Sequence, residues 1–331
     1  MEVEDGARAK NARSQGWRDP LRVTTTGATS RRCADRIRYI QSDGMFLRSV
    51  LRSVHRSLPP SLARLSERTL IVARSFRDQP LKRRVFGEKA YLVPPLYLME
   101  DGTREYREFE LNGLDAFRRF LTAGLRPTDR ILDIGSGVGR KTLPLLDFMT
   151  TGSYEGIDPI AKQVRWCTQR ISSRYPKFRF QQVDVWSKHY NPSGKIKPSE
   201  YKFPFADAEF DFVIMGSVLT HMFPRDMDHY VGEIARVLKP GGRGWITFFL
   251  LNEESLAAIS GGRSTQNLIH EVEEGSRADN PNRFETSVGH SEQGVLAMFA
   301  RHNIQAEVAE YGSWRGRQAD YYQDVVKISK N

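Results

Sequence analysis

The residues best suited to chemistry in this 331-residue chain lie in one glycine-rich segment, ILDIGSGVGRKT at positions 131–142. An apolar run that breaks into glycines predicts a strand followed by a turn whose backbone can approach a ligand closely. In an open α/β sheet, ligands bind outside the carboxyl ends of the strands, so we expect the ligand at this turn. Asp133 stands directly before the glycines, where its charge would repel a polyphosphate but suits a sulfonium or an amine.

Two other glycine-rich motifs compete with this interpretation. The dinucleotide-binding pattern GxGxxG and the P-loop pattern GxxxxGK[ST] both require a glycine at position 140, which is occupied by Arg140. The P-loop pattern is otherwise matched from Gly135 to Thr142. A P-loop-like nucleotide-binding protein is therefore an alternative.

With four later segments, the glycine motif resembles the class I S-adenosylmethionine-dependent methyltransferases. That family carries a DxGxGxG motif after its first strand. Here EGIDP (155–159), QVDV (182–185), FPFADAEFDFV (203–213) and VLKPGG (237–242) follow in the family's order and spacing. The resemblance covers residues 91–331 and implies S-adenosylmethionine as the cofactor.

The resemblance also implies a role for individual residues. Asp158, at the end of the second strand, would accept hydrogen bonds from both ribose hydroxyls. The segment after the fourth strand, beginning at Gly216, borders the methyl group, and His221 is the nearest residue whose ordinary pKa suits a general base. The remaining residues implied at the cofactor are Asp133, Gly135, Ser136, Gly137 and Gly139 for the methionine end, and Asp184 and Val185 for the adenine.

Several acceptor classes fit poorly. Family members that methylate exocyclic base amines have [DN]PP[YF] after the fourth strand, and this chain has MGSV at 215–218. Methylation at the five-position of pyrimidines needs a cysteine nucleophile, but Cys167 falls in the helix after Asp158. The expected acceptor is a hydroxyl or amine of a small molecule or glycan. A non-catalytic module that only binds S-adenosylmethionine is a second alternative.

The segments YLVPPLYLMEDG (91–102), FFLLNEE (248–254) and YGSWRGR (311–317) resemble bacterial methyltransferases associated with glycan synthesis. In the last segment, Trp314 with Arg315 and Arg317 is suited to stacking on a sugar or binding a phosphate, and an exposed turn with surface arginines is the simpler interpretation. The polar stretch 261–284 is expected to be an irregular insertion that covers the site as a lid.

The elements around these motifs alternate between strand and helix, which predicts a doubly wound, mostly parallel seven-stranded sheet of the Rossmann-like type. The last two strands are joined by a short turn and should pair antiparallel. Strands are predicted at 130–134, 153–157, 178–185, 210–215, 244–250, 304–311 and 322–328. Helices are predicted at 62–76, 106–123, 141–148, 160–174, 225–238 and 292–302.

The excess positive charge is confined to the front of the chain. Of the net charge of +10, residues 1–90 contribute +11, with 17 arginines. We expect residues 1–30 to be disordered, 31–90 to form a basic helical extension and 91–331 to form the methyltransferase domain. Residues 46–56 combine an apolar face with Arg48, Arg52 and Arg56, which suits docking on the domain or contact with an anionic membrane. Nucleic acid is disfavoured because interleaved aromatic residues are missing.

Composition limits the remaining classes. The chain has no run of 18 apolar residues, and its start, MEVED, does not resemble a secretory signal. Its two cysteines are far apart and outside any metal-ligand spacing, so no metal site is expected. These features predict a cytoplasmic protein, with peripheral membrane contact as the variant that the basic extension would allow.

Overall fold

The computed structural model describes residues 71–72, 74–75, 77–99, 103–280, 282 and 286–331. The chain divides into two compact units, Met1–Glu67 and Arg68–Asn331. The expectations for residues 1–30, for the helix over 46–56 and for most of the helix over 62–76 lie outside the described residues. All of the described residues belong to the second unit.

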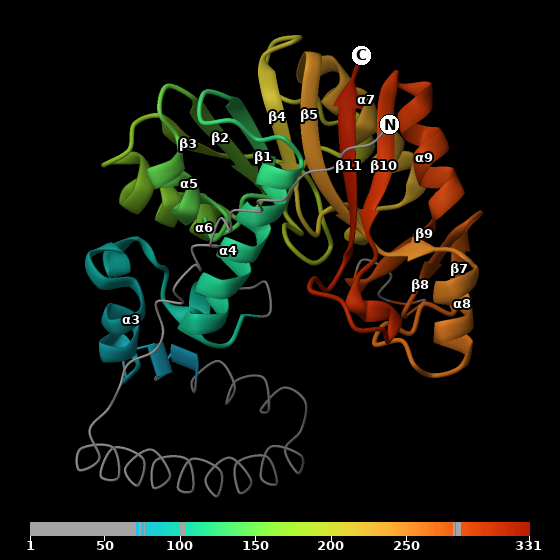
Figure 1. The fold of residues 1–331 in the computed structure, drawn as a ribbon, viewed down its shortest axis with the longest axis horizontal. Helices are drawn as coiled ribbons and strands as arrows, with labels where there is room; N and C mark the ends of the chain where they lie inside the picture. The colour runs from blue at the N-terminus through green and yellow to red at the C-terminus, as the bar shows by residue number, and fades with distance from the viewer. Residues whose placement is uncertain (1–70, 73, 76, 100–102, 281, 283–285) are drawn as a thin grey trace, which may run out of the picture. The chain divides into compact units, whose positions relative to one another are not determined.

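A seven-stranded sheet forms the centre of this unit (Figure 1), as the sequence predicts. Its strands are β1 (Arg130–Ile134), β2 (Ser153–Asp158), β3 (Phe178–Gln182), β4 (Phe210–Met215), β5 (Leu238–Phe248), β10 (Ile304–Glu310) and β11 (Asp324–Lys330). Their order across the sheet is β3-β2-β1-β4-β5-β11-β10. Only β11 runs antiparallel to its neighbours, so the carboxyl ends of β1, β2, β3, β4 and β5 meet at one edge.

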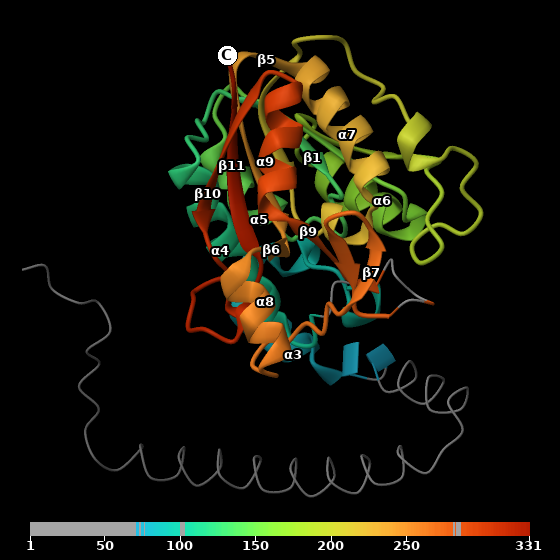
Figure 2. The same cartoon turned by 90° about the vertical axis from the view of Figure 1, so that its right-hand side faces the viewer.

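Helices cover both faces of the sheet, and each face has its own apolar core. Residues of α4 (Tyr106–Thr122), α5 (Thr142–Phe148) and α6 (Ala161–Cys167) pack on one face, and those of α7 (Pro224–Val237) and α9 (Glu292–Arg301) on the other. Figure 2 shows α7 and α9 to the right of β11 and α4 to its left. The other helices are α3 (Gln79–Phe86) and α8 (Glu253–Ser260), with a π turn at Thr168–Ser172 and 3-10 turns at Gly87–Leu92, Leu96–Leu98, Pro198–Glu200, Leu219–His221 and Ser313–Arg315.

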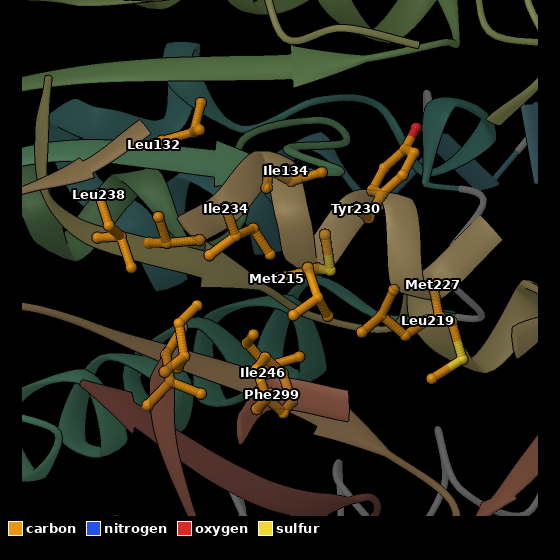
Figure 3. Packing of buried hydrophobic residues seen from close by; sticks show 14 of the residues in the cluster. Leu132, Ile134, Met215, Leu219, Met227, Tyr230, Ile234, Leu238, Ile246 and Phe299 are labelled. Atoms are coloured by element: carbon orange, nitrogen blue, oxygen red, sulfur yellow. The ribbon is translucent and has the colours of Figure 1, made fainter. Parts of the chain in front are cut away.

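Helix α7 illustrates how the local sequence builds these layers. Pro224 lies in its first turn, where the missing N–H costs nothing, and the helix ends at Val237 before the extended Leu238. Tyr230, Ile234 and Val237 recur at helical spacing and are buried. Figure 3 shows Tyr230 and Ile234 near Ile134 and Met215 of the central strands, and this packing fixes the helix beside the end of β4.

The insertion differs from its prediction. Rather than staying irregular, it contributes two strands to a second sheet of four, whose order is β6-β9-β8-β7. These are β6 (Leu250–Leu251), β7 (His270–Glu273), β8 (Ser276–Ala278) and β9 (Val288–Ser291). Strands β7 and β8 form a tight hairpin at Glu274 and Gly275, where Gly275 has φ +73°. The strands are so short and polar that no apolar alternation marks them in the sequence.

Several strand boundaries also differ from prediction, and β11 lies two residues later than predicted at both ends. Strand β5 begins at Leu238 rather than at 244, because Leu238 already pairs with β4 and the strand continues through an irregularity at Lys239 to Gly242, where the register shifts. Strand β3 ends at Gln182, three residues early. Within the described residues, no helix is both long and apolar enough to cross a bilayer.

Candidate active site

A cavity of about 830 Å³ opens at the edge where the parallel strands end. Its wall includes the turn after β1, the end of β2, the segment after β3 and the segment after β4. A further part of the wall comes from Gln266 of the insertion, from Ser287 just before β9, and from Tyr322 and Gln323 just before β11. The volume lies in the range of cavities that hold cofactors and small ligands.

The glycine turn shapes one side of this cavity. Gly135 and Gly137 have φ +76° and +57°, a region that favours glycine. A Cβ on Gly135 would stand 2.4 Å from Cγ2 of Val218, so the loops after β1 and β4 close against each other only because the side chain is absent. Gly135, Ser136 and Gly137 line the cavity, but Gly139 does not: a Cβ there would meet Ile171 at 2.8 Å.

Asp158 joins the end of β2 to the glycine turn. One carboxylate oxygen accepts the backbone N–H of Gly137 at 2.9 Å, and the other accepts that of Ile160 at 2.8 Å. Burial raises the pKa of Asp158 to about 6, and the two N–H groups oppose that rise. Asp158 lies in the cavity wall, where the sequence places it.

Asp133 does not lie in the cavity wall. Its side chain is fully buried, 2.8 Å from Nζ of Lys141, and it accepts the hydroxyl of Tyr154 at 2.6 Å. Lys141 also donates to the carbonyl of Gly135 at 3.0 Å. Burial raises the pKa of Asp133 while the ammonium of Lys141 opposes that rise. The acid that the sequence assigns to the methionine end therefore holds Lys141 and, through it, the glycine turn.

Asp184 and Val185 point to opposite sides of an extended segment. Val183 and Val185 are buried in the cavity wall, whereas Asp184 is exposed and absent from it. Alternate residues of an extended segment point to opposite sides, so two valines that face the cavity turn the intervening carboxylate away. The backbone carbonyl of Asp184 accepts N–H groups of Lys195 and Ile196. Asp184 therefore does not lie where the sequence analysis expects an acid beside the adenine.

The segment after β4 brings Gly216 and His221 to the cavity, as predicted. His221 ends the 3-10 turn Leu219–His221, and its Nε2 lies 3.2 Å from the hydroxyl of Tyr190. Tyr190 comes from the long connection after β3, where no motif marks it in the sequence. Ser217 has φ +58°, which is uncommon for a residue with a side chain.

His290 ties the second sheet to the turn that carries His221. Its Nε2 lies 3.2 Å from the carbonyl of Leu219, and its Nδ1 lies 2.9 Å from the hydroxyl of Ser276. Burial lowers the pKa of His290 to about 4, so the ring is neutral near pH 7 and donates to the carbonyl from Nε2. The second sheet thus supports the site from behind, while Gln266 of the insertion contributes to its wall.

The segment around Trp314 is not an exposed turn. Trp314 and Arg315 are fully buried, and the guanidinium of Arg315 donates to Asp324 from Nε at 2.9 Å and from Nη2 at 3.1 Å. Arg315 also donates to Asn252 and to the carbonyl of Leu250. Neither interpretation holds for these two residues, because they are buried and their donors join β11 to β6 and the start of α8.

Comparison with known proteins agrees with this geometry. Residues 132–246 match a family model described as a methyltransferase domain. An uncharacterized methyltransferase of Schizosaccharomyces pombe is 30% identical over 118 residues, 36% of this chain and 39% of that protein. A 27-O-demethylrifamycin SV methyltransferase of Amycolatopsis mediterranei is 33% identical over 132 residues, 38% of this chain and 41% of that protein. The alignments span about two fifths of each relative's length.

Among solved structures, a SAM-dependent methyltransferase from Methanosarcina mazei is similar at 24% identity and a TM-score of 0.39, covering 64% of this chain and 96% of that one. The family match spans the strands from β1 to β5, whose carboxyl ends bear the glycine turn and Asp158. The sheet has the seven strands that the resemblance predicts. S-adenosylmethionine is the cofactor of this family. Residues 132–246 thus form a methyltransferase domain, and the sheet built around them has the fold of the class I S-adenosylmethionine-dependent methyltransferases.

Proposed function

We propose that this protein transfers the methyl group of S-adenosylmethionine to a hydroxyl or amine of a small molecule or glycan. The observation that carries the proposal is that two different parts of the fold line one cavity. The glycine turn and Asp158 form one part of its wall, and the insertion and the approach to β11 form another. Such a cavity can hold a cofactor and an acceptor together, and bringing the two into line is the main requirement of a methyl displacement.

The residues around the glycine turn fit the cofactor. The hydroxyl of Ser136 is buried at the cavity wall without a hydrogen-bond partner among the described residues. The absent side chain of Gly135 leaves backbone at the surface of the turn. We assign the methionine end to Gly135, Ser136 and Gly137, and the ribose hydroxyls to the carboxylate of Asp158. The apolar side chains of Val183 and Val185 would contact the adenine. When bound, the cofactor supplies an electrophilic methyl group on a sulfonium.

His221 is the proposed general base. It lies in the cavity wall on the segment after β4, and a hydroxyl acceptor must lose its proton when the methyl bond forms. The hydroxyl of Tyr190 lies 3.2 Å from Nε2 of His221, and this hydrogen bond orients the imidazole ring. Tyr190 is thus a positioning residue for His221.

The acceptor part of the wall favours a small molecule with apolar surface. Aromatic side chains in the wall include Trp186, Tyr190, Phe223, Phe249 and Tyr322. One relative is named for 27-O-demethylrifamycin SV, a small molecule that lacks a methyl on oxygen. This name supports a small-molecule acceptor for the present chain.

The P-loop alternative is disfavoured by one contact. In a P-loop the lysine at the position of Lys141 reaches the phosphates of the nucleotide. Here its ammonium is paired with the buried Asp133, so its charge is already neutralised by a carboxylate. A titration with magnesium-ATP and one with S-adenosylmethionine separate the two readings directly.

Transfer of isotope-labelled methyl groups tests the proposal and the non-catalytic alternative. The full chain is incubated with S-adenosylmethionine carrying a deuterated methyl group and with cell extract, and products are searched by mass spectrometry for the label. We expect labelled small molecules that are absent without the protein. Binding of S-adenosylmethionine without any labelled product would favour a module that binds the cofactor and does not turn over.

The remaining proposal concerns the basic extension. Residues 46–56 would dock on the domain or hold the protein at an anionic membrane surface from the cytoplasm, where each arginine contributes about 1 kcal/mol. Co-sedimentation of the full chain with anionic and neutral vesicles, alongside a variant with Arg48, Arg52 and Arg56 replaced by alanine, separates these roles. If neither protein sediments with anionic lipid, the membrane role is wrong.

A further inference from the structure

A second feature of the cavity is a buried hydrogen-bond network just beyond the end of β4. Gln323 is 7% exposed and lies in the cavity wall. Its Oε1 accepts the hydroxyl of Ser217 at 2.8 Å and that of Thr247 at 2.7 Å. The backbone N–H of Ser217 in turn donates to Oγ1 of Thr247 at 2.8 Å. Three elements distant in sequence are thus joined around one side-chain amide.

This network fixes which end of the amide faces the cavity. Thr247 is fully buried, and its hydroxyl already accepts the N–H of Ser217, so its single proton needs an acceptor. Among the described residues, the acceptor of that proton is the oxygen of Gln323. Turning the amide over would place its NH2 group against that proton and leave a buried donor without a partner, at a cost of about 1–3 kcal/mol. The NH2 group must therefore lie away from Thr247.

The same network stabilises an unusual backbone. Ser217 holds φ +58°, a conformation that costs of order 1 kcal/mol or more for a residue with a Cβ. Its N–H and its hydroxyl are both bonded within the network, which offsets that cost. Backbone strain of this kind at a cavity wall is typical of functional sites.

The NH2 group of Gln323 donates no hydrogen bond to any described residue, although the rest of the side chain is fully engaged. It is a fixed pair of donors at a cavity wall. The network adjoins Gly216, and Val218 touches the glycine turn at Gly135, so the donors stand beside the cofactor part of the cavity.

We propose that Gln323 is a specificity-determining residue that binds an oxygen of the acceptor, and that the methylated atom is oxygen. This rests on the proposed function. An acceptor oxygen has one lone pair to attack the methyl carbon and another to accept from the amide. A neutral amine has a single lone pair, which methyl transfer consumes, and an ammonium would bring further donors against the NH2 group. In the transfer, the oxygen bonds to the methyl carbon, the C–S electron pair returns to sulfur and the hydroxyl proton passes to His221.

The test compares two variants of Gln323 in the full chain. Gln323→Glu keeps an oxygen for Ser217 and Thr247 but replaces the free donors with an acceptor, and Gln323→Leu removes both ends. Gln305→Glu, on the exposed side of β10, is the matched control for the added charge. Each protein is assayed with deuterated-methyl S-adenosylmethionine over a dilution series of cell extract, which gives a relative half-saturating extract concentration.

We expect the wild-type label on an oxygen, and half-saturation raised about tenfold or more in both Gln323 variants, as the loss of a hydrogen bond to substrate predicts. Affinity for S-adenosylmethionine, measured by calorimetry, should stay within twofold, which also shows that the variants fold. A product labelled on nitrogen, or unchanged half-saturation in a variant that binds the cofactor normally, would overturn the inference. Absence of any labelled product with the wild-type chain would instead refute the proposed function, and this inference with it.

Discussion

Replacing Asp158 by asparagine tests the cofactor site most directly. The carboxylate accepts two backbone N–H groups, and burial raises its pKa from 3.8 to about 6. If the ionised form also accepts ribose hydroxyls, the asparagine variant loses charge-assisted hydrogen bonds. The expected loss of cofactor affinity is about 1.5–3 kcal/mol, or roughly 10- to 150-fold.

The raised pKa gives this residue two pH signatures of opposite sign. Binding of the ribose hydroxyls needs the ionised carboxylate, so wild-type affinity should be constant above pH 7 and fall about tenfold per unit below pH 6. Stability behaves differently, because the unliganded folded state holds the proton more tightly than the unfolded chain. Asp158 therefore stabilises the fold most below about pH 3.8, and this contribution, about 3 kcal/mol, is lost as pH rises to about 6.

Calorimetric titration with S-adenosylmethionine between pH 5 and 8 measures the first signature, and urea unfolding without cofactor measures the second. The difference between wild type and Asp158→Asn isolates this carboxylate from other titrating groups. Asp184→Asn is the matched control, since that acid is exposed and outside the cavity wall, and its affinity should stay within about 0.5 kcal/mol of wild type. Equal pH profiles for wild type and Asp158→Asn would refute the assigned role.

Three further substitutions test other parts of the site and its support. Gly135→Ala should destabilise the fold by clearly more than Gly262→Ala in urea unfolding, because both glycines have positive φ but only the first would meet a neighbour within 4 Å; equal losses would contradict the close approach of the loops. His221→Gln should lower the rate of label transfer while cofactor affinity stays unchanged, and loss of both or of neither would remove it as a base. Arg315→Ala should destabilise the fold by about 3–5 kcal/mol, since it leaves its buried carboxylate partner uncompensated, whereas Arg317→Ala should change stability by less than about 0.5 kcal/mol; similar effects would contradict a buried ion pair.

Local patterns in the sequence predict much of the fold because they are short-range signals. Strand β4 spans the predicted residues 210–215, and helix α9 differs from its prediction by one residue. Apolar periodicity and glycine or proline breaks are properties of neighbouring residues, and they suffice to place such elements. The hairpin of β7 and β8 escapes this reasoning because its polar strands are stabilised by pairing with β9, which no local pattern records.

The residues of the candidate site also fall into two groups, those that local motifs predict and those that only the folded chain brings into place. The sequence by itself determined the turn at Gly135 to Gly137, the position of Asp158 at a strand end and the placing of His221 after β4, since each follows from a motif read beside a strand. Tertiary structure alone decided that Asp133 is neutralised by Lys141 and that Asp184 faces away from the cavity. It also brought together residues that are far apart in the chain.

Gln323 shows the physical reason most clearly. It lies 106 residues from Ser217 and 76 from Thr247, and neither Gln323 nor Thr247 belongs to a motif. The orientation of its amide follows from a proton that a buried hydroxyl must donate, and burial is a property of the packed sheet rather than of the sequence near any one residue. Residue types set what each side chain can donate or accept, and only the folded chain decides which partners remain to be met by a ligand.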